Sequence, residues 1–299
     1  MGEIFSLLTS VCWALTSIFF TAGGQRIGSS IVNRTRLLFG FVLLGVTNLI
    51  IYHEFIPLSA SPDRWLWMGA SGLVGLVLGD IFLFQSYLWI GPRRAMLIMA
   101  GVPVLNTIIA WFLLGETLSP FDLLGIVITV IGIFLVISEN LGGDETFSPK
   151  LPNFKLGILF CILGALGQSF GMILSKQGVY DNYPALSGTL MRVTIATAGM
   201  WLVALFQKQI KPSINAVKND RKALLFIFLG TLAGPFLGIW MMLAGLQNTN
   251  VGVASTLQSL APVLMLPVAH FYYKEKVTAR AISGTVVSMV GVALLFLLG

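Results

Sequence analysis

The chain of 299 residues is too apolar for a soluble domain, because 56% of its residues are hydrophobic and only 10% are charged. A soluble domain carries about 25% charged residues, and the mean hydropathy here is +0.89. The net charge of +6 is spread over the connections between apolar runs, which argues against nucleic-acid binding and favours contact with an anionic lipid surface.

Apolar runs of roughly 20 residues, enough to cross a hydrocarbon core of about 30 Å, predict an all-α integral membrane protein with ten transmembrane helices. The runs are continuously apolar, as expected of helices that satisfy their own backbone groups in lipid. They lie at 4–22, 33–52, 66–90, 94–114 and 120–138, then at 155–175, 184–206, 223–246, 250–272 and 278–298.

The helices fall into two units of five, at 1–138 and 155–299, joined by a polar linker at 139–154 that is rich in glycine, proline and charge. A second polar stretch, 207–222, carries five basic residues and is expected to lie along the membrane surface.

The last three helices of the two units repeat one another. The stretch from Gly75 to Leu135 returns without a gap as Gly234 to Leu294, at a constant offset of 159 residues. Internal duplications of apolar helices are typical of secondary transporters. We therefore expect two related five-helix units around a central cavity.

An odd number of helices per unit requires the two units to enter the membrane from opposite sides, so the repeats are predicted to be inverted. Charge agrees with this prediction. Of the 18 basic residues, only Arg64, Lys176 and Arg192 lie on the side of the termini. Because basic residues favour the cytoplasmic side, both termini are predicted to face outward.

One set of motifs occurs at matched places in both units. The motifs are Ala100-Gly101-Val102-Pro103-Val104, Leu114-Gly115-Glu116-Thr117-Leu118-Ser119, Gly125 and Gly132, repeated as Leu260-Ala261-Pro262-Val263, Lys274-Glu275-Lys276-Val277-Thr278, Gly284 and Gly291. Together with Trp13 and Arg36, these motifs resemble the pattern of the EamA-type drug/metabolite transporters, and the resemblance covers nearly the whole chain. The resemblance implies ten helices around a cavity and export or exchange of small metabolites, amino acids or drugs. It also implies cytoplasmic termini, opposite to the prediction from charge.

Residues kept in both units are expected to serve the shared helix geometry. Glu116 ends a helix before a tight turn, where its carboxylate is expected to accept from the N–H groups that open the next helix. Ser119 is expected to cap that helix. Small-residue stripes are expected to allow close helix contact; they are Gly125, Thr129 and Gly132, matched by Gly284, Ser288 and Gly291.

Pro103 and Pro262 occupy equivalent positions inside predicted helices, where each removes one backbone hydrogen bond. The freed carbonyls are those of Met99 and Gln258. Interrupted helices commonly line the substrate site of transporters, so both prolines are predicted hinges. The alternative is an ordinary packing kink.

Asp80 is the sharpest candidate for a functional residue, because it lies in the middle of a predicted helix and its counterpart is Ile239. An ionisable group at that depth marks a functional site by default. It is expected to carry a proton or to bind a substrate ammonium group; the alternative is a structural ion pair with Arg36 or Arg192. Both arginines are expected near helix ends, where they can reach the membrane surface.

Other polar and aromatic residues of the apolar runs are expected either to line the substrate cavity or to join helices and fill the core. The complete set of predicted substrate-binding residues is Trp13, Asp80, Gln85, Met99, Asn106, Gln168, Arg192, Trp240 and Gln258.

These features favour a secondary active transporter that moves a small metabolite, amino acid or drug-like solute across the cell (inner) membrane by alternating access. The alternatives are an intramembrane enzyme and a channel. The sequence has no phosphate-binding GxxxxGK[ST] loop and no repeated filter sequence, and neither histidine, His53 or His270, has a catalytic neighbour. No metal or cofactor is expected. Protons are the expected coupling ion, and the protein is expected to act as a monomer or homodimer.

Overall fold

The computed structural model describes residues 1–90, 95, 98–99, 101–138, 153–261, 263–264 and 279–297, and these contain helices and no strand. Six helices or helical units in this part of the chain are long and apolar enough to cross a membrane. Three are α1 (Gly2–Ile27), α2 (Ser29–Tyr52) and the unit Pro62–Ile90, and three are α8 (Phe154–Gly178), α9 (Ala185–Phe206) and the unit Arg221–Asn248.

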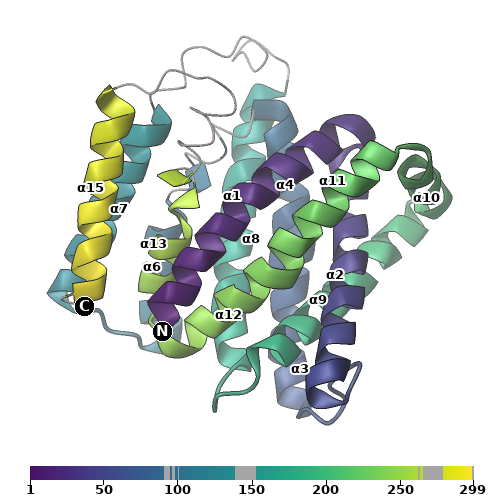
Figure 1. The fold of residues 1–299 in the computed structure, drawn as a ribbon, viewed down its shortest axis with the longest axis horizontal. Helices are drawn as coiled ribbons and strands as arrows, with labels where there is room; N and C mark the ends of the chain where they lie inside the picture. Colours follow the sequence, from purple (N-terminus) through teal and green to yellow (C-terminus); the bar gives the residue numbers. More distant parts are fainter. Residues whose placement is uncertain are drawn as a thin grey trace.

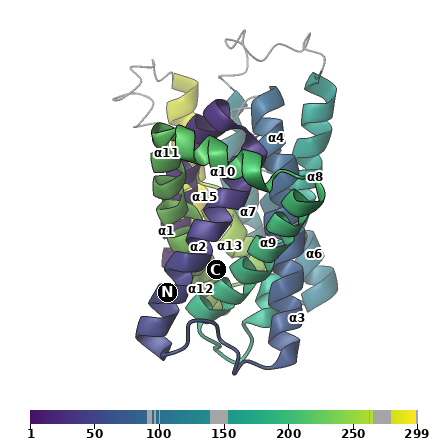
Figure 2. The same cartoon turned by 90° about the vertical axis from the view of Figure 1, so that its right-hand side faces the viewer.

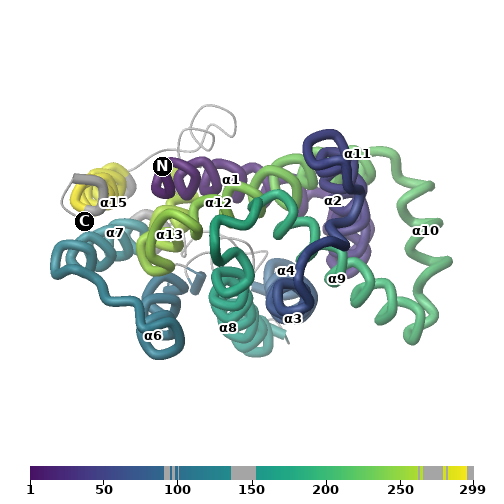
Figure 3. The backbone as a smooth tube through the Cα atoms, turned by 90° about the horizontal axis from the view of Figure 1, so that it is seen from below, coloured from purple at the N-terminus to yellow at the C-terminus, as the bar shows by residue number. Residues whose placement is uncertain are grey.

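Shorter helices lie where the other four membrane spans are expected. They are α6 (Val102–Leu114), α7 (Pro120–Ser138), α13 (Val251–Gln258) and α15 (Ala279–Leu297). A further helix, α10 (Ile210–Asn219), lies within the polar stretch that precedes Arg221. Figures 1 and 3 show α7 and α15 side by side at one edge of the molecule, with α10 at the opposite edge.

The two longest helical units each contain a π-helical segment, which the sequence analysis did not predict. The first unit runs as α3 (Pro62–Ser71), η1 (Gly72–Gly79) and α4 (Asp80–Ile90), and the second as α11 (Arg221–Thr231), η4 (Leu232–Gly238) and α12 (Ile239–Asn248). The two segments occupy equivalent places in the duplicated sequence. π-helical turns are frequent at functional sites, and Asp80 is the first residue after η1.

Glycines on η1 and α8 let these two elements touch at backbone distance. A Cβ added to Gly167 would lie 2.7 Å from the Cα of Gly79, and one added to Gly171 would lie 2.8 Å from the Cα of Gly75. Ser71 strengthens the contact, since its hydroxyl donates to the Gly171 carbonyl at 2.6 Å. The contact fixes α4 and its Asp80 against α8.

The contact between α7 and α15 has approximate two-fold symmetry. A Cβ on Gly132 would lie 2.4 Å from the backbone nitrogen of Ser288, and a Cβ on Gly291 would lie 2.3 Å from Oγ1 of Thr129. Gly132 and Gly291 are repeat counterparts, as are Thr129 and Ser288. The close contact expected from the small-residue stripes is therefore confirmed, and each unit presents the same surface to the other.

Glu116 does join helices, but not the pair that we expected. Its Oε2 accepts from the backbone N–H of Val251 at 2.8 Å, at the start of α13 in the second unit, and its Oε1 lies 3.4 Å from Nζ of Lys176. The expectation that it would cap the next helix, α7, was wrong. Ser119 caps α7 instead, as predicted, because Ser119 and Asp122 each accept from the other's backbone N–H.

Helix α10, in the polar stretch 207–222, lies across the bundle near one end, while α3 begins at the other (Figure 2). Its location along the membrane surface stays a prediction. Asp220 ties α10 to the bundle: it accepts from the N–H of Ala223 at 2.9 Å and from Nε of Arg26 at 2.7 Å. These two contacts hold the pKa of Asp220 below its ordinary value. The exposed basic residues around α10 are Lys208, Lys211, Lys218, Arg221 and Lys222.

We expect the basic α10 side to be cytoplasmic and both termini to face outward, because α10 lies nearer the upper end of the molecule in Figure 1, whereas the start of α1 and the end of α15 lie nearer the lower end. Alkaline phosphatase fused to the C-terminus should then be active. If the phosphatase is inactive and a green fluorescent protein fused to the C-terminus is fluorescent instead, the C-terminus is cytoplasmic and the prediction is contradicted.

Candidate functional site

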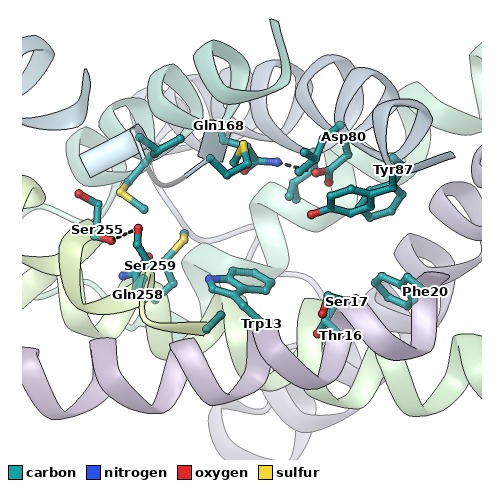
Figure 4. Close-up of a pocket in the computed structure, with 18 of the residues that line it drawn as sticks. Trp13, Thr16, Ser17, Phe20, Asp80, Tyr87, Gln168, Ser255, Gln258 and Ser259 are labelled. Carbon is teal, nitrogen blue, oxygen red and sulfur yellow. Dashed lines mark hydrogen bonds between the residues drawn. The ribbon is translucent and has the colours of Figure 1, made fainter. Parts of the chain in front are cut away.

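A cavity of about 200 Å³ lies within the bundle, lined by residues of both units (Figure 4). Helix α1 contributes one wall, with Trp13 and Ser17, and Asp80 and Gln168 stand opposite. The complete lining is Trp13, Thr16, Ser17, Phe20, Arg36, Leu76, Asp80, Leu83, Phe84, Tyr87, Met99, Val102, Gln168, Met172, Arg192, Met242, Ser255, Gln258, Ser259 and Ala261.

Most of the predicted site residues meet in this cavity, although the sequence separates them by as many as 245 positions, from Trp13 to Gln258. The predicted residues that line it are Trp13, Asp80, Met99, Gln168, Arg192 and Gln258.

Three predicted site residues lie outside the lining. Gln85 accepts a hydrogen bond from Ser29 at 3.1 Å and so joins α4 to α2. Asn106 is fully buried, with its amide nitrogen 3.3 Å from the sulfur of Met172. Trp240 packs against the core, and its ring centroid lies 6.1 Å from that of Phe236. For these three, the alternative of joining helices or filling the core fits the structure.

The centre of the cavity wall is a buried ion pair between Asp80 and Arg36, which are 4% and 2% exposed. Oδ2 of Asp80 accepts from Nη2 of Arg36, and Oδ1 accepts from Nε2 of Gln168. Asn33 orients the arginine by accepting from its Nε at 2.9 Å. Both carboxyl oxygens of Asp80 therefore already have a donor from within the protein.

Aromatic rings enclose the other side of the Arg36 guanidinium. Its Cζ lies 4.8 Å from the centroid of the Phe84 ring and 5.5 Å from that of Phe20. Stacking of a guanidinium on aromatic faces is favourable, and more so when the charge is desolvated. This environment keeps Arg36 in place beside Asp80.

Arg192 lines the same cavity, is 2% exposed, and has no hydrogen-bond acceptor for its Nε or Nη1 among the described residues. We expected Arg36 and Arg192 near helix ends, extended toward the membrane surface. Both instead point inward and are buried. Hydropathy alone missed this, because the inward direction comes from helix rotation and not from position along the helix.

Pro103 lies in the first turn of α6, which begins at Val102 after an N-cap at Gly101. In the first turn a proline removes no intrahelical hydrogen bond. Residues 95, 98 and 99 are also helical and 101 is a turn, so the predicted helix is interrupted just before Pro103. Pro262 lies outside the described residues. Met99, the residue whose carbonyl Pro103 was expected to free, contributes to the cavity wall.

Comparison with known proteins decides the family. A family profile described as "EamA-like transporter family" matches residues 1–138 and 155–297. The chain belongs to the EamA-like transporter family.

Relatives of this EamA protein are named as transporters. An uncharacterized transporter of Archaeoglobus fulgidus is 20% identical, over 98% of this chain and 97% of that one. The uncharacterized transporter YyaM of Bacillus subtilis is 24% identical, over 96% and 90%. Human solute carrier family 35 member G1 is 25% identical, over 61% and 50%. The EamA protein is thus a membrane transporter.

The fold of this EamA protein is also found in solved structures. One crystal structure matches it with a TM-score of 0.75 at 17% identity, covering 100% of this chain and 99% of the other. The described residues contain no group of three histidine, cysteine or acidic side chains that could hold a metal ion.

The sequence analysis missed several hydroxyl and aromatic residues of the EamA cavity. Those on α1 are Thr16, Ser17 and Phe20, which follow Trp13 at spacings of three, four and seven residues. That spacing places them on one helix face. A search for partners of Trp13 along its own face would have found them, and the same spacing links Ser255 to Gln258 and Ser259.

Proposed function

We propose that this EamA protein is a secondary active transporter and that the cavity is its substrate site. The observation that carries the proposal is a cavity whose wall combines α1, α4 and α6 of the first unit with α8, α9 and α13 of the second. A site between two related units opens to either side as the units move against each other. Its size suits a small metabolite, an amino acid or a drug-like solute.

Inverted repeats favour alternating access, and two features support an organisation of ten helices in two inverted units. In the contact between α7 and α15, Gly132 faces Ser288, and its repeat counterpart Gly291 faces Thr129, the counterpart of Ser288. A two-fold axis between the units requires this reciprocal pattern. The π-helical segments η1 and η4 also fall at equivalent positions. We therefore propose inverted units at 1–138 and 155–299, with residues 139–154 as the linker.

We propose the proton as the coupling ion, because Asp80 is the one carboxyl group among the described residues that line the cavity. Protonation would weaken its pair with Arg36 and so favour a different packing of α2 against α4. The lining combines residues of both units of the chain, so each protomer, alone or in a homodimer, is the proposed transport unit in the cell (inner) membrane.

Pro103 is proposed as a hinge at the start of α6. Replacing Pro103 with alanine should permit the helix to continue through Gly101, so the variant should remain folded but transport more slowly. Melting temperature and initial uptake rate distinguish this from packing: equal losses of both would show that Pro103 serves stability alone.

Counterflow in proteoliposomes tests the proposed function. Vesicles preloaded with an unlabelled solute should take up the labelled solute transiently above equilibrium, and uptake should saturate. Uptake that rises linearly with concentration and shows no counterflow would indicate a channel. Conversion of the solute would indicate an enzyme.

A further inference from the structure

The charges that line the cavity do not balance. Among the described lining residues, two are cationic, Arg36 and Arg192, and one is anionic, Asp80. Asp80 is bonded to Arg36 and Gln168 through its two oxygens. Asp80 also attracts Arg192 electrostatically, but one carboxylate cannot balance two guanidinium groups, so the described lining keeps one net positive charge.

The free guanidinium of Arg192 faces a high cost of burial. It is 2% exposed, and its Nε and Nη1 have no acceptor within the described part of the chain. A buried charge without a partner is strongly unfavourable, whereas one with a hydrogen-bonded counter-ion is tolerated. An anion bound in the cavity would lower this cost.

Glycines hold the guanidinium in position. A Cβ added to Gly75 would lie 2.8 Å from Nη2 of Arg192, and one added to Gly171 would lie 3.3 Å from the same atom. The backbone of Arg192 is equally confined, because a Cβ on Gly72 would lie 2.3 Å from its carbonyl oxygen. The guanidinium thus occupies a space that only glycine leaves open on η1 and α8.

We propose that the cavity binds its substrate as a monoanion, with a carboxylate group at the guanidinium of Arg192 and the apolar part of the substrate among Trp13, Phe84 and Met172. The proposal rests on the transport function above and names its substrate class. A planar carboxylate matches the fork of a guanidinium. One unpaired cation matches one negative charge, so a phosphate dianion is disfavoured. An ammonium group at Asp80, which the sequence analysis considered, does not fit, because both oxygens of Asp80 already have donors.

Matched ligand triplets test this inference by thermal shift on the purified full chain. Each triplet is a carboxylate, its primary amide and the corresponding amine on one carbon skeleton, from acetate up to 3-phenylpropionate. We expect only carboxylates to raise the melting temperature, since a ligand stabilises the state that binds it. Arg192→Gln should weaken that binding at least about tenfold, as expected for lost charge-assisted hydrogen bonds.

Arg34→Gln is the matched control, because Arg34 is a buried arginine outside the cavity that bonds Ser213 at 2.6 Å. It should leave carboxylate binding unchanged. Without ligand, Arg192→Gln should melt no lower than the parent, since it removes an unpaired charge. Arg192→Lys keeps the charge without the fork and should bind with intermediate strength.

Stabilisation by amides or amines as strong as by carboxylates, no response to any carboxylate, or carboxylate binding that survives Arg192→Gln would each overturn the proposal. Carboxylate binding without counterflow would contradict the transport function and leave this site standing. Counterflow confined to amines or neutral solutes would support transport and overturn the carboxylate site.

Discussion

Replacing Asp80 with asparagine is expected to abolish solute accumulation and to destabilise the protein by about 3–5 kcal/mol, because breaking a buried ion pair leaves its partner uncompensated. The partner is Arg36, which is 2% exposed and would join Arg192 as a second unpaired cation in the cavity wall. Asparagine also cannot take up or release a proton at this position, so it cannot couple uptake to a proton gradient. Chemical denaturation in detergent and pH-dependent uptake into proteoliposomes measure the two effects.

The double variant Asp80→Asn with Arg36→Met separates stability from coupling. Removing both charges should restore much of the lost stability, since an apolar replacement of a buried pair is often neutral or better. Accumulation should remain absent. An Asp80→Asn variant as stable as the parent, with unchanged pH-dependent uptake, would show that Asp80 has neither role.

Alanine at Gly132 is expected to lower stability by about 1–3 kcal/mol or more, because overpacking forces backbone shifts. The added Cβ would lie 2.4 Å from the backbone nitrogen of Ser288, which cannot move without α15. Gly291→Ala should cost a similar amount, since its Cβ would lie 2.3 Å from Oγ1 of Thr129 in the counterpart contact.

Gly24→Ala is the control for both variants. A Cβ added to Gly24 would lie 4.0 Å from the Cα of Ser29, an ordinary van der Waals distance, so there is room for the methyl group. Alanine also favours helix over glycine by about 1 kcal/mol. Melting temperatures of all three variants test the contact. If Gly132→Ala and Gly291→Ala are as stable as Gly24→Ala, the α7–α15 contact is looser than described.

The internal duplication was the most informative feature of the sequence, because it identified residues that allow close contact between helices. Gly132 and Gly291 lie where two helices touch, and Ser119 caps α7, as their recurrence and local pattern predicted. Asp80 was singled out because its counterpart, Ile239, cannot ionise, and it does line the cavity. Local rules and repeat comparison were sufficient for these residues.

Rotation about the helix axis and long-range pairing were not predictable from the sequence. Trp240 and Asn106 are aromatic or polar residues in apolar helices like Trp13 and Gln168, yet only Trp13 and Gln168 line the cavity, because of how the helices are turned. The π-helical segments lie in contacts between helices, which a single helix does not reveal: η1 touches α8, and Gly234 of η4 touches Thr16 of α1. The hydrogen bond from the Val251 N–H to Glu116 was also not predictable, because it forms where the two units pack together.

Labelling of a single cysteine in the cavity tests the central claim, that this cavity opens in turn to the two sides of the membrane. Ser17 lines the cavity and is replaced by cysteine after Cys12 and Cys161, which are buried, are changed to alanine. A membrane-impermeant maleimide should label the new cysteine from either side, in vesicles of both orientations, and transported solute should protect it. A Ser6→Cys variant, at a fully buried position outside the lining, should remain unlabelled. Labelling of Ser17→Cys from one side only, whatever the solute or pH gradient, would contradict alternating access through this site.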